Sequence, residues 1–390
     1  MTDQNQKPKI PFRVFAFIIF VAGTGFSLVG SILPDFADRF ALSNSQAARI
    51  PLTYFLGDMC GLLAIGFLLS RPRAVIIGTL GLLAPAAAWV ALAPAYTPAL
   101  LLPFFVLGGA SGIIITLPSM IVGRIYRGES PRLMNLMFGF FAAGVTVAPL
   151  GFGGLRALGF HYPTAYGILG ALGAAGFFLT LMTAVTEPDL GRGLAASAVA
   201  ALWRSDKRTL VVVSLMDAFY VGAEAVPNAW IPKFLNDRFP GGSEVRSVAL
   251  LSLFWAGMTA GRFISAALLR RGVAPRAMLI SLLCLAAAAL ALAPWMGARL
   301  VVEALFASSG LFFSGVFPLI ISHTDGIADE HSGTFFVIIM AAGMVGASAV
   351  SPVVGWLAET VGFHWGMMAA PALALMVLAL AVTLRPKPKP

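Results

Sequence analysis

Long apolar runs separated by short polar stretches dominate the pattern along the chain. A membrane-spanning helix needs about 20 consecutive, mostly apolar residues. Runs of that length predict twelve spans, at residues 12–34, 47–69, 74–94, 98–122, 133–155, 163–186, 209–234, 247–269, 276–294, 299–322, 332–357 and 363–384. The pattern therefore predicts an all-α membrane protein with twelve transmembrane helices.

The composition favours a membrane protein over a soluble one. Hydrophobic residues make up 59% of the 390 residues and charged residues only 11%, whereas soluble domains carry about 25% charged residues. The net charge of +9 is explained by loop residues, so no nucleic-acid partner is expected. Cys60 and Cys284 both lie in apolar spans and the histidines are scattered, so we expect no disulfide framework, metal site or cofactor.

Lysine and arginine residues in the loops predict the orientation in the membrane. If the N-terminus is cytoplasmic, most of the 26 Lys and Arg residues fall in inner segments, and Arg262 lies inside span eight. The first apolar run begins at Pro11, exceeds the length of a signal peptide and lacks a convincing cleavage site. We therefore expect an uncleaved protein of the bacterial inner (plasma) membrane, surrounded by the lipid bilayer, with both termini in the cytoplasm.

The two halves of the chain resemble each other at an offset of about 200 residues. Gly57 and Gly61 recur as Gly257 and Gly261, and the sequence ALAP occurs at 91–94 and at 291–294. The longest polar stretch lies between spans six and seven. These features predict two pseudo-symmetric six-helix bundles, residues 1–186 and 208–390, joined by a cytoplasmic linker at 187–207 whose middle forms a short interfacial helix.

Twelve spans, two similar halves and a central linker resemble the major facilitator superfamily over the whole chain. The family's loop between spans two and three is similar to the stretch from Gly66 to Arg73, although Ser70 replaces an acid. In the family this loop is a cytoplasmic latch between helices. The residues concerned, in the loop and in its second-half counterpart, are Ser70, Arg71, Arg73, Arg262, Arg270 and Arg271. They either form such a latch or simply anchor the loops on the cytoplasmic side through their positive charge.

Within this superfamily, the stretch from Phe219 to Glu224 resembles the seventh-span signature of the fucose:proton symporter family. The resemblance implies transport of a sugar together with a proton. The acid of that family's first span is absent, because Gly30 occupies its place, and span four contains no acid. The family's coupling residues therefore cannot be transferred to this chain.

A second resemblance lies in span five. The run from Gly144 to Gly154 is similar to the glycine and proline pattern of exporters, with Ala148 in place of one glycine. Small residues allow helices to approach closely, and Pro149 bends the span. Ordinary helix packing explains the same residues. Two interpretations of the pattern therefore remain open, an exporter motif and a purely structural packing motif.

Span seven carries two acids inside an apolar run. Asp217 and Glu224 are two helical turns apart, and with Tyr220, Asn228 and Ile231 they fall within roughly 80° on a helical wheel. An ionisable residue inside a membrane span costs about 2.5 to 3.5 kcal/mol on insertion scales. This stripe is therefore expected to face a wet pathway or a partner rather than lipid.

Two acids are candidates for proton coupling. Glu224 lies near the middle of span seven, where a carboxyl can load and release a proton, and a neutral acid bonded to a neighbouring helix is the alternative. Asp58 lies at the centre of span two, where the repeat has Met258, so the scaffold itself does not require an acid. Asp58 is therefore a candidate second protonation site or interhelical gate.

Asp217 and Arg262 lie at matching depths on consecutive spans, each roughly 10 to 12 Å from the inner end. An ion pair between them would remove two unpaired charges from the membrane. We predict this structural pair, with a gating or proton role as the alternative.

The superfamily resemblance implies that spans one, four, seven and ten line the substrate site. The polar and aromatic residues on these spans give the predicted substrate-binding set, Ser27, Ser31, Thr116, Tyr220, Glu224, Asn228, Trp230, Ser309 and Phe313. Apart from Glu224 and Asn228 the polar members are mainly hydroxyls, which suits a small polyol less well than a partly apolar solute.

No phosphate-binding loop or catalytic constellation is found, so we expect neither an enzyme nor an ATP-driven pump. The sequence predicts a secondary active transporter that works by alternating access and functions as a monomer. Proton-coupled symport of a small, sugar-like organic solute is the first hypothesis, and a proton-antiporting exporter of drugs or metabolites is the alternative. A non-transporting membrane sensor or scaffold would lack a site between the bundles.

Overall fold

Helices account for every regular element of the computed structural model, which describes residues 12–68, 71–125, 130–183, 196–241, 244–321 and 329–383. Within these ranges, 12 helices are long and apolar enough to cross a membrane. They span Phe12–Ser31, Asn44–Ile65, Pro72–Leu92, Pro98–Val122, Met137–Ala157, Tyr162–Met182, Lys207–Arg238, Val245–Arg270, Pro275–Trp295, Arg299–Ile321, Val337–Thr360 and Phe363–Thr383. Each predicted span coincides with one of these helices, so the all-α prediction is confirmed.

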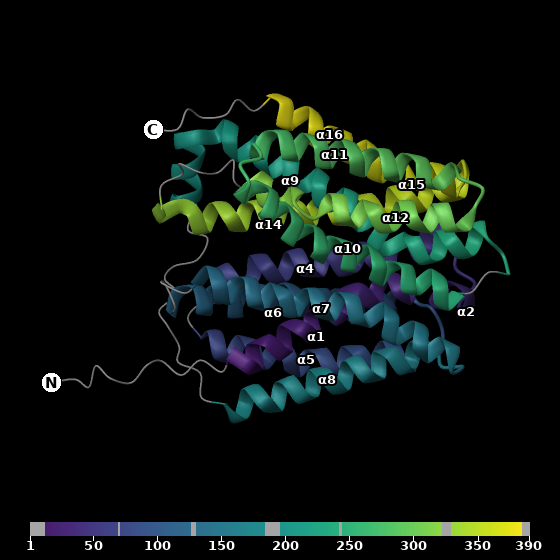
Figure 1. The fold of residues 1–390 in the computed structure, drawn as a ribbon. Coiled ribbons are helices and arrows are strands. Elements are labelled where there is room, and N and C mark those ends of the chain that lie inside the picture. Colours follow the sequence, from purple (N-terminus) through teal and green to yellow (C-terminus); the bar gives the residue numbers. More distant parts are fainter. Residues whose placement is uncertain are drawn as a thin grey trace.

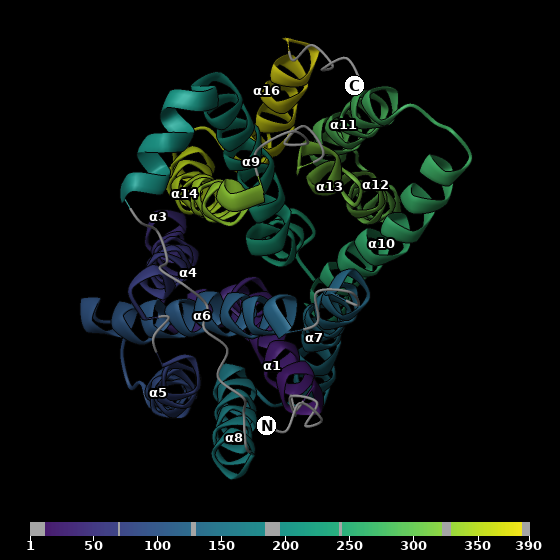
Figure 2. The same ribbon diagram turned by 90° about the vertical axis from the view of Figure 1, so that its left-hand side faces the viewer.

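The helices form two six-helix bundles that lie side by side (Figure 2). The first bundle contains α1 (Phe12–Ser31), α4 (Arg49–Leu68), α5 (Pro72–Leu92), α6 (Leu101–Ile125), α7 (Ser130–Ala157) and α8 (Tyr162–Met182), with the short α2 (Leu33–Arg39), α3 (Asn44–Ala47) and η1 (Pro98–Leu100). The second contains α9 (Ala196–Arg238), α10 (Glu244–Arg270), α11 (Pro275–Leu292), α12 (Arg299–Phe313) with α13 (Val316–Ile321), α14 (Asp329–Thr360) and α16 (Ala369–Thr383), with η2 (Ala293–Trp295) and α15 (Phe363–Met367).

The repeated glycines make the same helix contact in each bundle. A Cβ atom at Gly57 of α4 would lie 2.0 Å from the carbonyl oxygen of Phe105 on α6. In the second bundle, a Cβ atom at Gly257 of α10 would lie 2.9 Å from the carbonyl oxygen of Ala307 on α12. Small residues at these positions let two backbones approach closely, which is how helices associate inside a membrane. The sequence repeat therefore corresponds to a repeated packing contact.

Two arginines also repeat a contact. Arg73, at the start of α5, donates from Nη2 to the carbonyl oxygen of Leu181 in the last turn of α8, at 3.0 Å. Arg276, at the start of α11, donates to the carbonyl oxygen of Val382 in the last turn of α16, at 2.8 Å. Carbonyl groups in the last turn of a helix lack intrahelical partners, and a cation there is favourable. Arg73 thus joins two helices of its own bundle.

The other arginines of the latch motif, Arg71, Arg270 and Arg271, are exposed. Ser70 and the neighbouring residue 69 lie outside the described residues.

Helix α9 begins earlier than span seven was predicted to begin. It runs without interruption for 43 residues from Ala196 to Arg238, with Pro227 and Pro232 in its interior. Its first turns lie across the end of the bundle before the helix enters the span (Figures 1 and 2). The short helix expected within the linker is therefore present from Ala196 onwards, and it is continuous with the span rather than separate from it. Residues 187–195 lie outside the described part of the chain.

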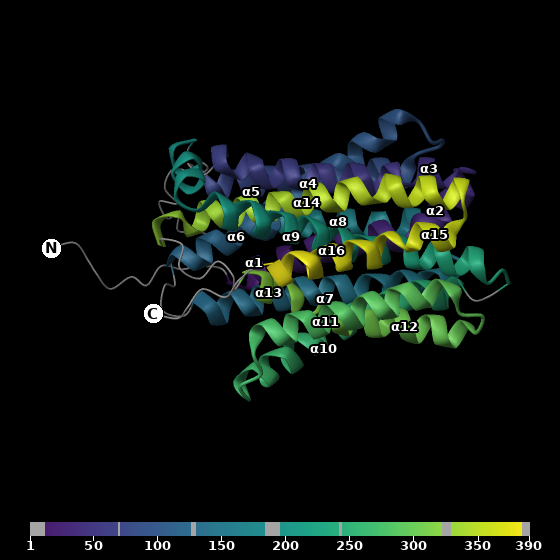
Figure 3. The same cartoon turned by 90° about the horizontal axis from the view of Figure 1, so that it is seen from above.

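The start of α1 and the end of α16 lie at one end of the bundle, which we call the near end (Figures 1 and 3). The opposite end, which we call the far end, holds close contacts between the two halves. A Cβ atom at Gly30 of α1 would lie only 1.8 Å from the carbonyl oxygen of Asn228 on α9. The Ser45 hydroxyl of α3 donates to the carboxylate of Glu359 on α14.

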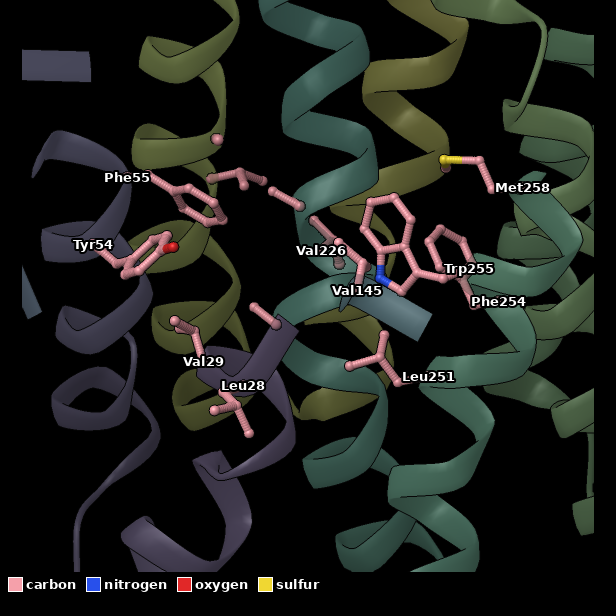
Figure 4. Close-up of a cluster of buried hydrophobic side chains, with 14 of the residues drawn as sticks. Leu28, Val29, Tyr54, Phe55, Val145, Val226, Leu251, Phe254, Trp255 and Met258 are labelled. Carbon is pink, nitrogen blue, oxygen red and sulfur yellow. The ribbon is translucent and has the colours of Figure 1, made fainter. Parts of the chain in front are cut away.

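A buried contact between α7 and α10 joins the halves closer to the middle, where Ser252 Oγ donates to the carbonyl oxygen of Thr146 at 2.7 Å. Apolar side chains from both halves meet beside it (Figure 4). Trp255 of α10 lies near Val145 of α7 and Val226 of α9, and its ring centroid is 5.8 Å from that of Phe26 on α1. The far half of the interface is therefore packed and largely apolar.

Candidate functional site

Polar side chains of α9 and α10 meet on the near-end side of this apolar contact. Asn228 of α9 accepts a hydrogen bond at Oδ1 from Trp255 Nε1 of α10, at 3.0 Å, and both residues are buried. Glu224 and then Tyr220 follow Asn228 at four-residue steps toward the near end. On α10, Arg262 follows Trp255 by seven residues and therefore lies on the same helix face. The two helices thus bring an amide, a carboxyl, a phenol and a guanidinium onto facing surfaces.

Arg262 and Glu224 are the charged residues of this group. The polar groups that act on the Glu224 carboxyl are the Tyr220 hydroxyl and the Arg262 guanidinium. Glu224 is partly exposed and Arg262 is exposed. Arg262 Nη2 lies 3.9 Å from Met258 Sδ one turn away, and Met258 points toward the other helices (Figure 4). The next two residues of α10 are apolar, with Phe263 74% and Ile264 51% exposed, as expected for a surface against lipid.

Asp217 takes a different position from the one predicted. Its side chain is fully buried, and neither carboxylate oxygen has a hydrogen-bond partner within the described part of the chain. Oδ2 lies against α14, where a Cβ atom at Gly343 would be only 2.5 Å away. The predicted ion pair with Arg262 is therefore wrong. Equal depth on consecutive helices does not fix which neighbour a side chain faces, and α9 packs against α14 as well as α10.

Tyr220 connects the site to α12 and α13. Its hydroxyl donates to the carbonyl oxygen of Phe313 at 3.4 Å, and its ring lies edge-on to Phe313 with centroids 5.8 Å apart. The ring also stacks on Phe317 at 6.4 Å. Tyr220 and Phe313 are both buried, so they form an aromatic wall behind Glu224.

The other members of the predicted substrate-binding set are dispersed. Trp230 is fully buried on another side of α9, with its ring centroid 5.6 Å from that of Phe363 on α15. The Ser309 hydroxyl donates to the carbonyl oxygen of Phe306 in its own helix, at 2.7 Å. The structure therefore brings Tyr220, Glu224, Asn228 and Phe313 together and places Trp230 elsewhere.

On α1 and α6 the predicted hydroxyls are also not grouped with Glu224. Ser31 donates to the carbonyl oxygen of Ser27 at 2.9 Å. Ser27 Oγ is buried without a hydrogen-bond partner among the described residues, and Thr116 is half-buried on α6.

Asp58 lies inside the first bundle and is 7% exposed. Its Oδ1 atom faces α6, where a Cβ atom at Gly112 would be 2.5 Å away. The Tyr54 hydroxyl and Ser111 Oγ are buried nearby and have no hydrogen-bond partner in the described ranges. Buried polar groups without partners are uncommon, and ordered water often satisfies them. Asp58 therefore lies in a polar patch separate from the one around Glu224.

The exporter-like run on α7 serves helix packing at both of its ends. A Cβ atom at Gly144 would lie 2.2 Å from the carbonyl oxygen of Phe20 on α1, and one at Gly153 would lie 3.4 Å from Val245 on α10. Pro149 is buried in the interior of α7. These contacts are the ones expected for helix packing, and none of them is specific to an exporter.

Two residues of this region were not predicted from the sequence. Trp255 holds Asn228 through its indole N–H, and Phe26 packs against Trp255 and, with ring centroids 5.8 Å apart, against Phe55. The spacing of Trp255 and Arg262, two turns apart on one face, was visible in the sequence and could have identified Trp255.

Comparison with known proteins identifies the family. The model of the major facilitator superfamily matches residues 15–336. The chain belongs to the major facilitator superfamily. As a member of this superfamily it is an integral membrane transporter for small-molecule substrates. The described residues contain no group of three or more His, Cys, Asp or Glu residues that could hold a metal ion.

Solved structures of other transporters share the fold of this major facilitator superfamily protein. The E. coli fucose:proton symporter is 19% identical, with 97% of this chain and 99% of that chain covered and a TM-score of 0.67. The D-xylose-proton symporter is 13% identical, with 96% and 97% covered and a TM-score of 0.77. The nucleoside transporter NupG is 13% identical, with 95% and 97% covered and a TM-score of 0.71. Among curated proteins, no sequence matches the chain.

Proposed function

We propose that the chain is a proton-coupled symporter that moves a small, sugar-like organic solute by alternating access. The observation that carries this proposal is the partly exposed Glu224 inside the membrane-spanning part of α9, within reach of Tyr220 and of Arg262 on α10. Ionisable residues inside membrane spans commonly mark substrate or proton pathways. The fucose:proton and D-xylose-proton symporters, which share this fold, support proton coupling and a sugar-like solute.

In this proposal each residue of the site has a role. Glu224 takes up and releases the coupled proton, and Asp58 is a second protonation site. Asn228, held by Trp255, and the aromatic wall of Tyr220 and Phe313 contact the solute. The packed far end closes one side of the pathway, and the near end is the cytoplasmic side according to the distribution of lysine and arginine. The protein acts as a monomer in the inner (plasma) membrane of a bacterium, with bundles 1–186 and 208–390 as its moving parts.

The alternative is a proton-antiporting exporter of drugs or metabolites. It is supported by the run from Gly144 to Gly154, which resembles the pattern of exporters. The two functions predict opposite proton movements when the solute is added outside lightly buffered cells. Symport makes the medium more alkaline, and antiport driven by the same solute makes it more acidic.

The test uses cells that express the protein and a panel of pentoses, hexoses and sugar acids, with external pH as the readout. We expect at least one solute to make the medium alkaline with the wild type and not with Glu224→Gln. Gln preserves the size of the side chain but cannot exchange a proton. Alkalinisation of the same extent in the Glu224→Gln variant, or acidification on addition of a solute, would contradict the proposal. Arg204→Gln, an exposed position in the first turns of α9, is the control for expression and surface charge.

A further inference from the structure

Arg262 is the cation that the proposed mechanism leaves without a permanent partner. It lies eight residues from the end of α10 at Arg270, about 12 Å along the helix. Its side chain is exposed, and it makes no ion pair within 4 Å with any described residue, because the predicted partner, Asp217, faces α14 instead. A guanidinium at this depth is costly unless water or an anion compensates its charge.

The surroundings of Arg262 provide one candidate anion from the protein. Glu224 of α9 lies within electrostatic reach of Arg262 on the neighbouring helix α10. Among the other ionisable groups on and around α9, Asp217 is buried against α14, and Arg13 of α1 and Arg270 of α10 lie close to the near end. The following acids lie toward the far end and have partners of their own. Asp35 of α2 pairs with Arg156, Glu303 of α12 pairs with Arg246 and Arg299, and Glu359 of α14 accepts from Ser45. His364 of α15 stacks on Trp295.

We propose that Arg262 binds the carboxylate of the transported solute and that this carboxylate competes with Glu224 for the same guanidinium. The solute class is a hydroxylated monocarboxylate of three to six carbons, such as an aldonic or uronic acid. This inference rests on the proposed function, and it changes the solute from a neutral sugar to a sugar acid.

The chemistry of the side chains supports this class. A guanidinium presents a planar set of donors that matches a carboxylate in a bidentate geometry, and it stays charged at every relevant pH. Asn228 supplies an amide, and Tyr220 with Phe313 supplies an apolar wall, which suits the hydroxylated and carbon-bearing parts of such a solute. Apart from Arg262, the Lys and Arg residues inside described spans lie close to a helix end, and Lys233, the deepest of these, pairs with Asp237.

Competition for one cation also couples the proton to the solute. When Glu224 is ionised, its carboxylate neutralises Arg262 and repels a second anion. When Glu224 takes up a proton, Arg262 is free for the solute, so one proton enters the site with each anion. The loaded site then has the same net charge as the empty site with ionised Glu224. Transport of the pair moves no net charge, unlike symport of a proton with a neutral sugar.

Binding to the purified protein in detergent tests this inference without any proton gradient. The probes are matched pairs, D-glucuronate with D-glucose, D-galacturonate with D-galactose, and D-glycerate with glycerol. The readout is the thermal stabilisation of the protein as a function of probe concentration between pH 6 and pH 8, where these acids stay ionised because carboxyls of this kind titrate near 3.5. We expect one acid to stabilise the wild type and its neutral partner not to do so.

The pH dependence and the variants identify the groups involved. Uptake of one proton with the anion weakens the apparent affinity about tenfold per pH unit on the alkaline side. In Glu224→Gln the affinity should stay at its acidic value across the range. Arg262→Gln should lose about 100-fold in affinity, and Arg262→Lys about tenfold, since the ammonium keeps the charge without the planar donors. Arg204→Gln should bind as the wild type does.

Three outcomes would overturn the inference, namely no stabilisation of the wild type by any acid of the panel, equal stabilisation by a neutral partner, or unchanged affinity in both Arg262 variants. Failure of the proposed function looks different. If an acid binds through Arg262 but causes no alkalinisation in cells, proton coupling is wrong and the solute class stands. If a neutral sugar causes alkalinisation that depends on Glu224, proton coupling stands and the solute class is wrong.

Discussion

At the offset of about 200 residues that relates the two halves, Glu224 of α9 corresponds to Thr24 of α1, and Arg262 of α10 corresponds to Leu62 of α4. Thr24 Oγ1 donates to the carbonyl oxygen of Phe20 in its own helix at 3.0 Å, and Leu62 is buried in the first bundle. The first half therefore has no equivalent of the facing carboxyl and guanidinium. Asp58 is the converse case, because its equivalent in the second half is Met258.

The contacts that hold the helices together are the ones that both halves share. The glycines of α4 and α10 and the arginines at the starts of α5 and α11 make corresponding contacts. The comparison separates two kinds of residue. Residues required by the packing of a six-helix bundle occur twice, and charged residues inside the spans occur once. A charged residue without a counterpart, such as Glu224, Arg262, Asp58 or Asp217, is therefore not required by the packing of a six-helix bundle.

The largest expected effect comes from filling the repeated glycine contact. Gly57→Val should destabilise the protein by about 3 kcal/mol, because its Cβ atom would lie 2.0 Å from a backbone carbonyl that cannot move freely. Gly257→Val should cost less, since the corresponding distance is 2.9 Å. Thermal unfolding in detergent, followed by size-exclusion chromatography, measures both. Gly78→Ala is the control, since a Cβ atom there has nothing within 4 Å. Equal unfolding temperatures for Gly57→Val and Gly257→Val would mean that the two halves do not differ in this contact.

The next effect separates the two candidate acids for proton coupling. Glu224→Gln should reduce accumulation driven by a pH gradient in proteoliposomes at least tenfold, about 1.4 kcal/mol of coupling free energy. Asp58→Asn should slow uptake but keep most of the accumulation, because Asp58 is buried against Gly112 while Glu224 is partly exposed. Steady-state accumulation and initial rate are measured on the same samples. The opposite result, with coupling lost only in Asp58→Asn, would move the coupling site to the first half.

A smaller effect tests whether the repeated arginine contacts are equivalent. Arg73→Gln and Arg276→Gln each remove one hydrogen bond to a helix end and should each cost about 1 kcal/mol of stability. The double variant should show the sum of the two effects, since the sites lie in different bundles and share no partner. Unfolding temperatures of the single and double variants provide the measurement. A loss confined to one of them would show that the two contacts are not equivalent.

The smallest effect concerns the hydrogen bond between the halves. Ser252→Ala removes the donor to Thr146 and should shift the population away from this conformation by about 0.5 kcal/mol. Spin labels at Gln46 and Val361, which lie in the two halves near the far end, report that shift as a longer distance. Ser348→Ala is the control, since the Ser348 hydroxyl donates to Met344 within its own helix. An unchanged distance distribution in Ser252→Ala would show that this bond does not hold the far end closed.

The sequence was sufficient to predict the twelve spans, because a helix that crosses lipid must be apolar over a length set by the bilayer. It was also sufficient for the repeat, since Gly57, Gly61, Gly257 and Gly261 are required where backbones touch. It placed Glu224 on a polar face with Tyr220 and Asn228, and the structure keeps these residues together.

The partners of the charged residues could not be predicted in the same way. Asp217 and Glu224 share one face of an ideal helix, yet Asp217 packs against α14, and Glu224 lies within electrostatic reach of Arg262 on α10. The difference arises because α14 packs against one part of that face and α10 against another. The local sequence pattern of α9 does not determine which neighbour lies where. Trp255 was missed for a similar reason, because its indole donor acquires a role only once Asn228 lies opposite it.

The continuous course of α9 has a mechanical consequence. Its first turns, with Trp203 54% exposed and Arg204 beside it, lie across the bundle end, and the same unbroken helix carries Glu224 into the site. Indole and guanidinium groups are favourable at the level of lipid headgroups. The first turns and Glu224 therefore belong to one continuous stretch of helix, so a tilt of the first turns is not absorbed by a loop before it reaches Glu224.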